Sequence, residues 1–82
     1  MAASDTQVGG DHYQTPIQHH EFVRANNVPW HEANTIKYAM RHKKKNGIED
    51  VKKAIHYLLL MAELEYPDQQ EYLAEEIKKM LD

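Results

Sequence analysis

The sequence predicts an all-α domain of three to four short helices, preceded by an extended arm and assembled as a homo-oligomer. Apolar residues recur at helical spacing, no segment alternates with a period of two, and Gly and Pro separate the helical stretches. The 82 residues suffice for one domain, residues 17–82. A core of this size is marginal and the chain has no cysteine for disulfides, so we expect copies to associate.

The N-terminal segment, residues 1–16, has little apolar content and contains the Gly9-Gly10 pair and Pro16. These features are typical of an extended or flexible arm with a turn at the glycines. Arms of this kind often become ordered on a neighbouring surface. Whether this arm acts in its own subunit or in a neighbouring one stays open.

The first helix is predicted over residues 17–25, with Ile17 and either Phe22 or Val23 facing inward. It is short and depends on packing for its stability. The asparagine pair that ends with Asn27 tolerates left-handed backbone and therefore suits the end of a helix.

The second helix is predicted over residues 30–44, because Pro29 suits a helix start and Asn46-Gly47 suits a turn or a C-terminal cap. Three consecutive lysines lie near its C-terminal end, where the negative end of the helix dipole stabilises cations. Its apolar positions predict a core side made of Ala33, Ile36, Ala39 and Met40.

The third helix, residues 49–65, has the strongest pattern, with apolar residues at offsets of three, four, seven, eight and eleven: Val51, Ala54, Ile55, Leu58, Leu59 and Ala62. Its apolar surface is wider than one neighbouring helix would cover. We expect a second subunit there, and the alternative is a four-helix core that surrounds this helix. After a break at Tyr66-Pro67, a fourth helix over residues 69–81 presents Tyr72 or Leu73, Ile77, Met80 and Leu81 on one side.

Charge is distributed unevenly along the chain. The net charge of −3 hides a segment, residues 30–53, in which seven Lys or Arg residues face three acidic ones, a net of +4. A basic middle between acidic flanks favours a confined anion site over a general nucleic-acid surface, so nucleic acid is not the expected partner. The chain has no membrane span and no apolar leader, and we expect a cytoplasmic protein without a membrane partner.

One stripe of the second helix combines cations, an amide and aromatic rings. Arg and Lys bind phosphate oxygens, an Asn amide reads a base or ribose edge, and Trp or Tyr stacks on a base. This composition therefore indicates a phosphorylated nucleotide as the ligand. The alternative is a solvated basic face with an anchoring Trp. The stripe, spaced by four, three, one, three and four, comprises Trp30, Asn34, Lys37, Tyr38, Arg41 and Lys45.

A second set lies at spacings of three and four on the third helix and consists of Asp50, Lys53 and Tyr57. Asp50 could pair with Arg41 or with a lysine and hold it in place, while Lys53 adds charge to the same pocket. The alternative is an ordinary surface ion pair, worth under about 1 kcal/mol.

Six histidines raise the question of a metal site. His31-Glu32 begins like a zincin motif, but Thr35 stands where the second histidine ligand belongs, so no metal is expected. His12, in the arm, is instead predicted to contact a phosphate or ribose. The chain also lacks a GxxxxGK[ST] phosphate loop, a GxGxxG motif and a serine nucleophile elbow.

Several of these residues together resemble a family of small bacteriophage proteins of unknown function that are often labelled nucleotide kinase. The family is similar to the C-terminal part of a coliphage deoxynucleoside monophosphate kinase that lacks a Walker motif, whose additional N-terminal region is missing here. The resemblance covers roughly residues 9–60. It rests on Gly10-Asp11-His12-Tyr13, Pro16, Glu21-Phe22-Val23, the run from Asn34 to Arg41, the lysine cluster, the run from Glu49 to Ala54, and Tyr57-Leu58.

The resemblance implies a multimeric phage protein that handles nucleotides in the infected bacterial cell. Sequestration of a nucleotide signal of antiviral defence, of the cyclic nucleotide or ADP-ribose type, is the first expected function. A nucleoside monophosphate kinase is the alternative, and only that activity requires ATP; no other cofactor is expected. The polar residues that match the family's pattern are His12, Tyr13, Asn34, Lys37, Tyr38, Arg41, Lys44 or Lys45, Asp50, Lys53 and Tyr57.

Overall fold

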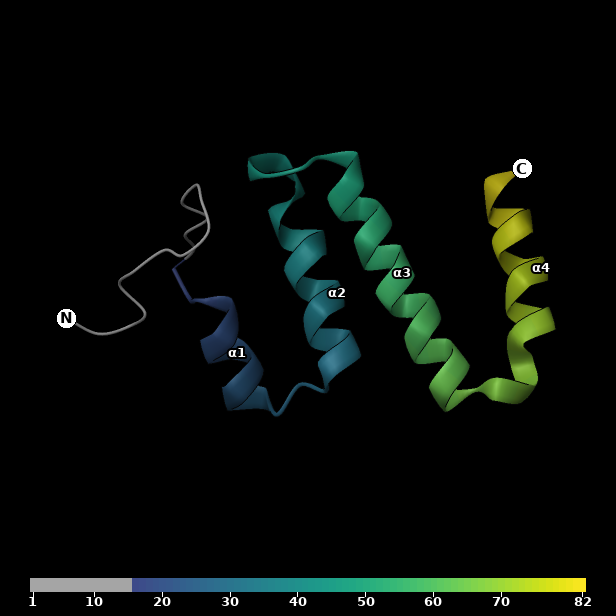
Figure 1. The fold of residues 1–82 in the computed structure, drawn as a ribbon, viewed down its shortest axis with the longest axis horizontal. Helices are drawn as coiled ribbons and strands as arrows, with labels where there is room; N and C mark the ends of the chain where they lie inside the picture. Colours follow the sequence, from purple (N-terminus) through teal and green to yellow (C-terminus); the bar gives the residue numbers. More distant parts are fainter. Residues whose placement is uncertain (1–15) are drawn as a thin grey trace.

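The computed structural model describes residues 16–82, and this part of the chain is entirely helical apart from its turns. Its four α-helices are α1 (His19–Asn26), α2 (Trp30–Arg41), α3 (Ile48–Glu65) and α4 (Gln70–Leu81). Two short 3-10 helices, η2 (His42–Lys44) and η3 (Pro67–Gln69), precede α3 and α4. Seen down the shortest axis of the molecule, the four helices follow one another across a single layer (Figure 1). The predicted all-α class is therefore confirmed for the described residues, while the arm lies almost entirely outside them.

Helix α1 begins two residues later than predicted, because Gln18 is still extended at φ −68° and ψ 146°. Ile17 is therefore not part of the helix, and at 66% exposure it does not face inward as predicted. Val23 is half-buried, whereas Phe22 is exposed. The predicted cap is present: Asn27 adopts a left-handed conformation, and the Val28 N–H donates to the Val23 carbonyl, as in a Schellman motif.

Helix α2 starts directly after Pro29, as predicted, but ends at Arg41. The last predicted turn is instead the 3-10 helix η2, and tightening of this kind is common where a helix ends. The chain then reverses: the Gly47 N–H donates to the His42 carbonyl at 2.8 Å, and α3 runs back alongside α2 (Figure 1). The predicted turn at Asn46-Gly47 is thus correct.

Gly47 adopts φ 58° and ψ −127°, a conformation that L side chains rarely reach. A Cβ at this position would meet no atom within 4 Å, so only the backbone demands glycine. We expect Gly47→Ala to destabilise the fold by about 1–3 kcal/mol, measured by urea unfolding. Asn27→Gly is the control, since glycine readily adopts the left-handed backbone there. Equal stability of Gly47→Ala and the wild type would contradict the assigned turn.

The close contact of the fold is between α2 and α3. The buried apolar side chains of the described part are small: Ala33 on α2, and Ala54 and Ala62 on α3. The predicted core side of α2 is wrong apart from Ala33: Ile36 is only half-buried, and Ala39 and Met40 are exposed. Helix α3 packs instead against the Tyr38 and Arg41 side of α2.

The wide apolar surface predicted for α3 is present and largely uncovered. Ile55, Leu58 and Leu59 are 51%, 44% and 38% exposed, so the four-helix core surrounding α3 does not occur within residues 16–82. Helix α4 meets α3 near η3, where Gln70 Nε2 donates to the Ala62 and Tyr66 carbonyls at 3.1 and 2.8 Å. These bonds tie the first residue of α4 to the C-terminal end of α3 and fix the turn. On α4, Leu73 and Ile77 are half-buried, while Tyr72, Met80 and Leu81 are exposed.

Candidate functional site

The centre of the candidate site is a buried ion pair between α2 and α3. Arg41 donates from Nε and Nη2 to the two carboxylate oxygens of Asp50, each at 3.3 Å. The Asp50 side chain is fully buried and that of Arg41 is 17% exposed, so the ordinary surface ion pair is ruled out. The backbone N–H of Asn46 also donates to Asp50, at 3.1 Å. One carboxylate therefore joins the end of α2, the turn and the start of α3.

The surroundings of Asp50 affect its pKa in opposite directions. Burial raises the pKa, whereas the hydrogen bonds from Arg41 and Asn46 and the charge of Arg41 lower it, and the net result is a pKa below its ordinary value. Asp50 is thus ionised at neutral pH with its oxygens already engaged. It acts as a structural anchor, and Arg41 is held by it.

Next to this pair lies a group of aromatic rings. Tyr38 and Tyr57 stack with ring centroids 5.7 Å apart and an angle of 8° between their planes. Trp30 meets Tyr57 edge-on at 5.4 Å, although 62% of the Trp30 surface remains exposed. Two histidines that were not among the predicted site residues also join the group: His31 contacts Trp30, and His56 contacts Tyr57. Their only sequence signal is that each adjoins an aromatic residue of the set.

Three cations converge on the ring of Tyr38. Its centroid lies 4.5 Å from Arg41 Cζ, 5.3 Å from Lys53 Nζ and 5.4 Å from Lys37 Nζ. Cations this close to an aromatic face are attracted by the ring quadrupole. Arg41 is neutralised by Asp50, whereas neither lysine has a salt bridge to a carboxylate of residues 16–82. We call Trp30, Lys37, Tyr38, Lys53 and Tyr57 the cationic-aromatic face.

The remaining predicted site residues lie apart from this face or outside the described residues. The Asn34 side-chain amide donates to the Trp30 carbonyl of its own helix at 2.9 Å, so it is engaged with backbone. Lys45 is half-buried at the end of η2, and no contact places it near the Tyr38 ring. His12 and Tyr13 belong to residues 1–15, which are not described. In residues 16–82, no three metal-ligating side chains come together.

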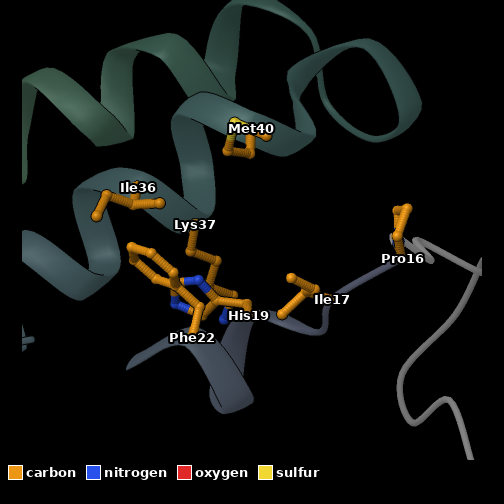
Figure 2. A pocket seen from close by; sticks show the side chains of 7 residues that line it. All are labelled: Pro16, Ile17, His19, Phe22, Ile36, Lys37 and Met40. Atoms are coloured by element: carbon orange, nitrogen blue, oxygen red, sulfur yellow. The ribbon is translucent and has the colours of Figure 1, made fainter. Parts of the chain in front are cut away.

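Lys37 also borders an apolar groove of about 420 Å³ between α1 and α2 (Figure 2). Figure 2 shows Lys37 extending from α2 toward His19 and Phe22 of α1. Burial and the nearby charge of Lys37 lower the pKa of His19. The groove is lined by Pro16, Ile17, His19, Phe22, Ile36, Lys37 and Met40.

Comparison with known proteins identifies one family. Residues 8–59, more than half of the chain, match the family described as "Protein of unknown function (DUF3310)". No curated protein and no solved structure matches the chain. None of the helices within residues 16–82 is long and apolar enough to span a bilayer. The matched residues include α1, α2 and the part of α3 that carries the cationic-aromatic face, and the chain belongs to the DUF3310 family of proteins of unknown function.

Proposed function

We propose that this chain binds a phosphorylated nucleotide at the cationic-aromatic face and holds it without converting it. The observation that supports this proposal most directly is the uncompensated positive charge beside exposed aromatic surface. Lys37 and Lys53 come from α2 and α3, with Nζ atoms within 5.4 Å of the Tyr38 ring centroid. A phosphate between them would neutralise both ammonium groups.

Aromatic surface for a base is available next to these lysines. Trp30 packs edge-on against Tyr57, which restrains the indole while leaving most of its surface exposed. Bases stack on such rings with little dependence on their identity, at about 1–3 kcal/mol per base. Phosphate contacts from lysine and stacking on Trp30 together favour a nucleotide over a simple anion as the ligand.

Binding without turnover is the better-supported mode. A nucleoside monophosphate kinase must hold two nucleotides in line and transfer a phosphoryl group to a phosphate oxygen of the monophosphate, largely by positioning and electrostatic stabilisation. The cationic-aromatic face offers two lysines without a carboxylate partner in residues 16–82 and one exposed indole, whereas the nearby Arg41 is held by the buried Asp50. Nucleotide sequestration needs only the charge and the rings. In a phage-encoded homo-oligomer, it would remove a cyclic nucleotide or ADP-ribose signal of antiviral defence.

The test compares the nucleotide that is added to the protein with the nucleotide that is released from it on denaturation. The full chain is incubated with cyclic dinucleotides, with ADP-ribose, or with ATP and each deoxynucleoside monophosphate, and is then separated from free nucleotide by gel filtration. We expect denaturation to release one of these nucleotides unchanged, in stoichiometric amount. Recovery of diphosphate products would contradict sequestration and support the kinase alternative. Absence of any retained nucleotide would contradict the binding proposal.

A further inference from the structure

Helices α3 and α4 leave a set of large apolar side chains uncovered. On α3, Ile55, Leu58 and Leu59 are 51%, 44% and 38% exposed, and on α4, Met80 and Leu81 are 76% and 81% exposed. Scattered single apolar residues are normal on a protein surface, but a group on two adjacent helices indicates an interaction surface. We call these five residues the α3–α4 apolar face.

The arrangement of the two helices explains why this face is open. Gln70 fixes the beginning of α4 to the end of α3 through its bonds to the Ala62 and Tyr66 carbonyls. From this turn, α4 diverges from α3 toward its C-terminus (Figure 1). Ile55, Leu58, Leu59 and Ala62 share one side of α3 because they are spaced by three, four and seven residues. The side of α3 that contacts α4 near their shared turn is therefore uncovered toward the N-terminal end of α3.

We propose that a second copy of this chain covers the α3–α4 apolar face, with α4 of each copy packed between α3 and α4 of the other. The first reason is the lack of a core in the single chain. The buried apolar residues of the described part are three alanines, Ala33, Ala54 and Ala62. Full burial of a Leu, Ile or Met side chain contributes about 1.5–3 kcal/mol, and the single chain forgoes much of this contribution at five positions.

The identity of the partner follows from this deficit. A surface needed for folding must be covered whenever the chain folds, and a copy of the same chain is the partner present wherever it is made. A two-fold arrangement brings the same surface of both copies together, which suits an apolar stripe with charged side chains at its edge. Charged side chains border this side of α3, since Glu49, Lys52 and Lys53 line a hollow together with Ile55 and Leu59. The apolar positions at helical spacing on α3 and α4 are Ile55, Leu58, Leu59, Ala62, Leu73, Ile77, Met80 and Leu81.

The dimensions also suit a dimer of this kind. At 1.5 Å per residue, α3 and α4, with 18 and 12 residues, are about 27 and 18 Å long. Two copies of this helix pair form a four-helix bundle, in which apolar side chains of all four helices meet in one core. A stable interface of standard size takes about 800 Å² from each partner, and two helices per copy provide a surface of this order.

The experiment measures the mass of the full chain in solution by light scattering, together with its melting temperature over a range of concentrations. We expect twice the 9.6 kDa chain mass and a melting temperature that rises with concentration. Ile55→Asp and Met80→Asp should each shift the mass to that of one chain, since each places a charge in the apolar contact. Tyr72→Asp is the matched control: Tyr72 is 65% exposed on α4 but is not at the spacing of the apolar face.

A single-chain mass for the wild type with a concentration-independent melting temperature would overturn the proposal. So would a wild-type dimer that persists in both Ile55→Asp and Met80→Asp. The wild-type measurement needs no substitution and therefore does not depend on whether a variant folds. The nucleotide proposal is tested separately, because Lys37 belongs to α2, which contributes no residue to the α3–α4 apolar face, and Lys37→Glu should leave the mass unchanged.

Discussion

Asp50→Ala is expected to lower the melting temperature by about 10 °C or more, a larger loss than any substitution at an exposed position of α2 or α3 should cause. The substitution leaves the largely buried guanidinium of Arg41 without its carboxylate and the Asn46 N–H without its acceptor. Removing one partner of a buried ion pair is far more destabilising than removing a surface pair, because the remaining charge stays desolvated. Thermal unfolding monitored by circular dichroism measures the effect.

Glu49→Ala is the matched control for this prediction. Glu49 is the neighbouring carboxylate, also in the first turn of α3, but its side chain is 62% exposed and lies 3.9 Å from Lys52. Exposed pairs of this kind contribute little, so the melting temperature of Glu49→Ala should stay within about 3 °C of the wild type. If Asp50→Ala and Glu49→Ala lowered the melting temperature equally, the role of Asp50 as a buried anchor between α2 and α3 would be contradicted.

The same carboxylate gives the stability a defined pH dependence. The pKa of Asp50 in the folded chain lies below its ordinary value of 3.8, so the unfolded chain takes up the proton first. The stabilisation by ionised Asp50 is therefore fully present above its unfolded pKa and is lost as the pH falls through its folded pKa. Asp50→Asn has no carboxylate to protonate, so its stability deficit relative to the wild type, measured by urea unfolding, should narrow in that acidic range.

Local sequence signals predicted the helices and their turns well. Asn27 and Gly47 adopt the positive-φ backbone that their residue types tolerate, and Tyr66-Pro67 ends α3 as expected. These features depend on a few neighbouring residues, which is why the sequence reveals them. The end of α2 was less predictable. The change to a 3-10 helix at His42 accompanies the reversal of the chain and the contacts of Asp50 across the turn.

The side of α2 that packs on α3 could not be predicted from apolar spacing. Ile36 and Met40 fit a core pattern, yet α3 packs on the side that carries Tyr38 and Arg41. Apolar spacing locates the core only when apolar side chains are buried within one chain, and this chain leaves many of them exposed. The two sets of site residues predicted from spacing nevertheless contain residues that contact each other, since Tyr38 of the first set stacks on Tyr57 of the second.

The double substitution Lys37→Glu/Lys53→Glu is expected to weaken binding of a phosphorylated nucleotide by about 100-fold or more. A hydrogen bond to a charged group contributes about 1.5–3 kcal/mol, and about 1.4 kcal/mol corresponds to a factor of ten, so the loss of two contacts accounts for this change. The two new carboxylates would also repel the phosphate. Equilibrium dialysis at fixed ionic strength, with the nucleotide that the wild type retains, measures the effect.

Arg41 is unsuited to this test, because its replacement would also remove the partner of Asp50 and disturb the fold. The two lysines are suited to it, since neither forms a salt bridge with a carboxylate in residues 16–82 and Lys53 is exposed. Lys52→Glu is the matched control: it carries the same charge change on α3, one residue away, but Lys52 pairs with Glu49. Unchanged affinity in the double variant, or an equal loss in Lys52→Glu, would show that the phosphate does not lie between Lys37 and Lys53.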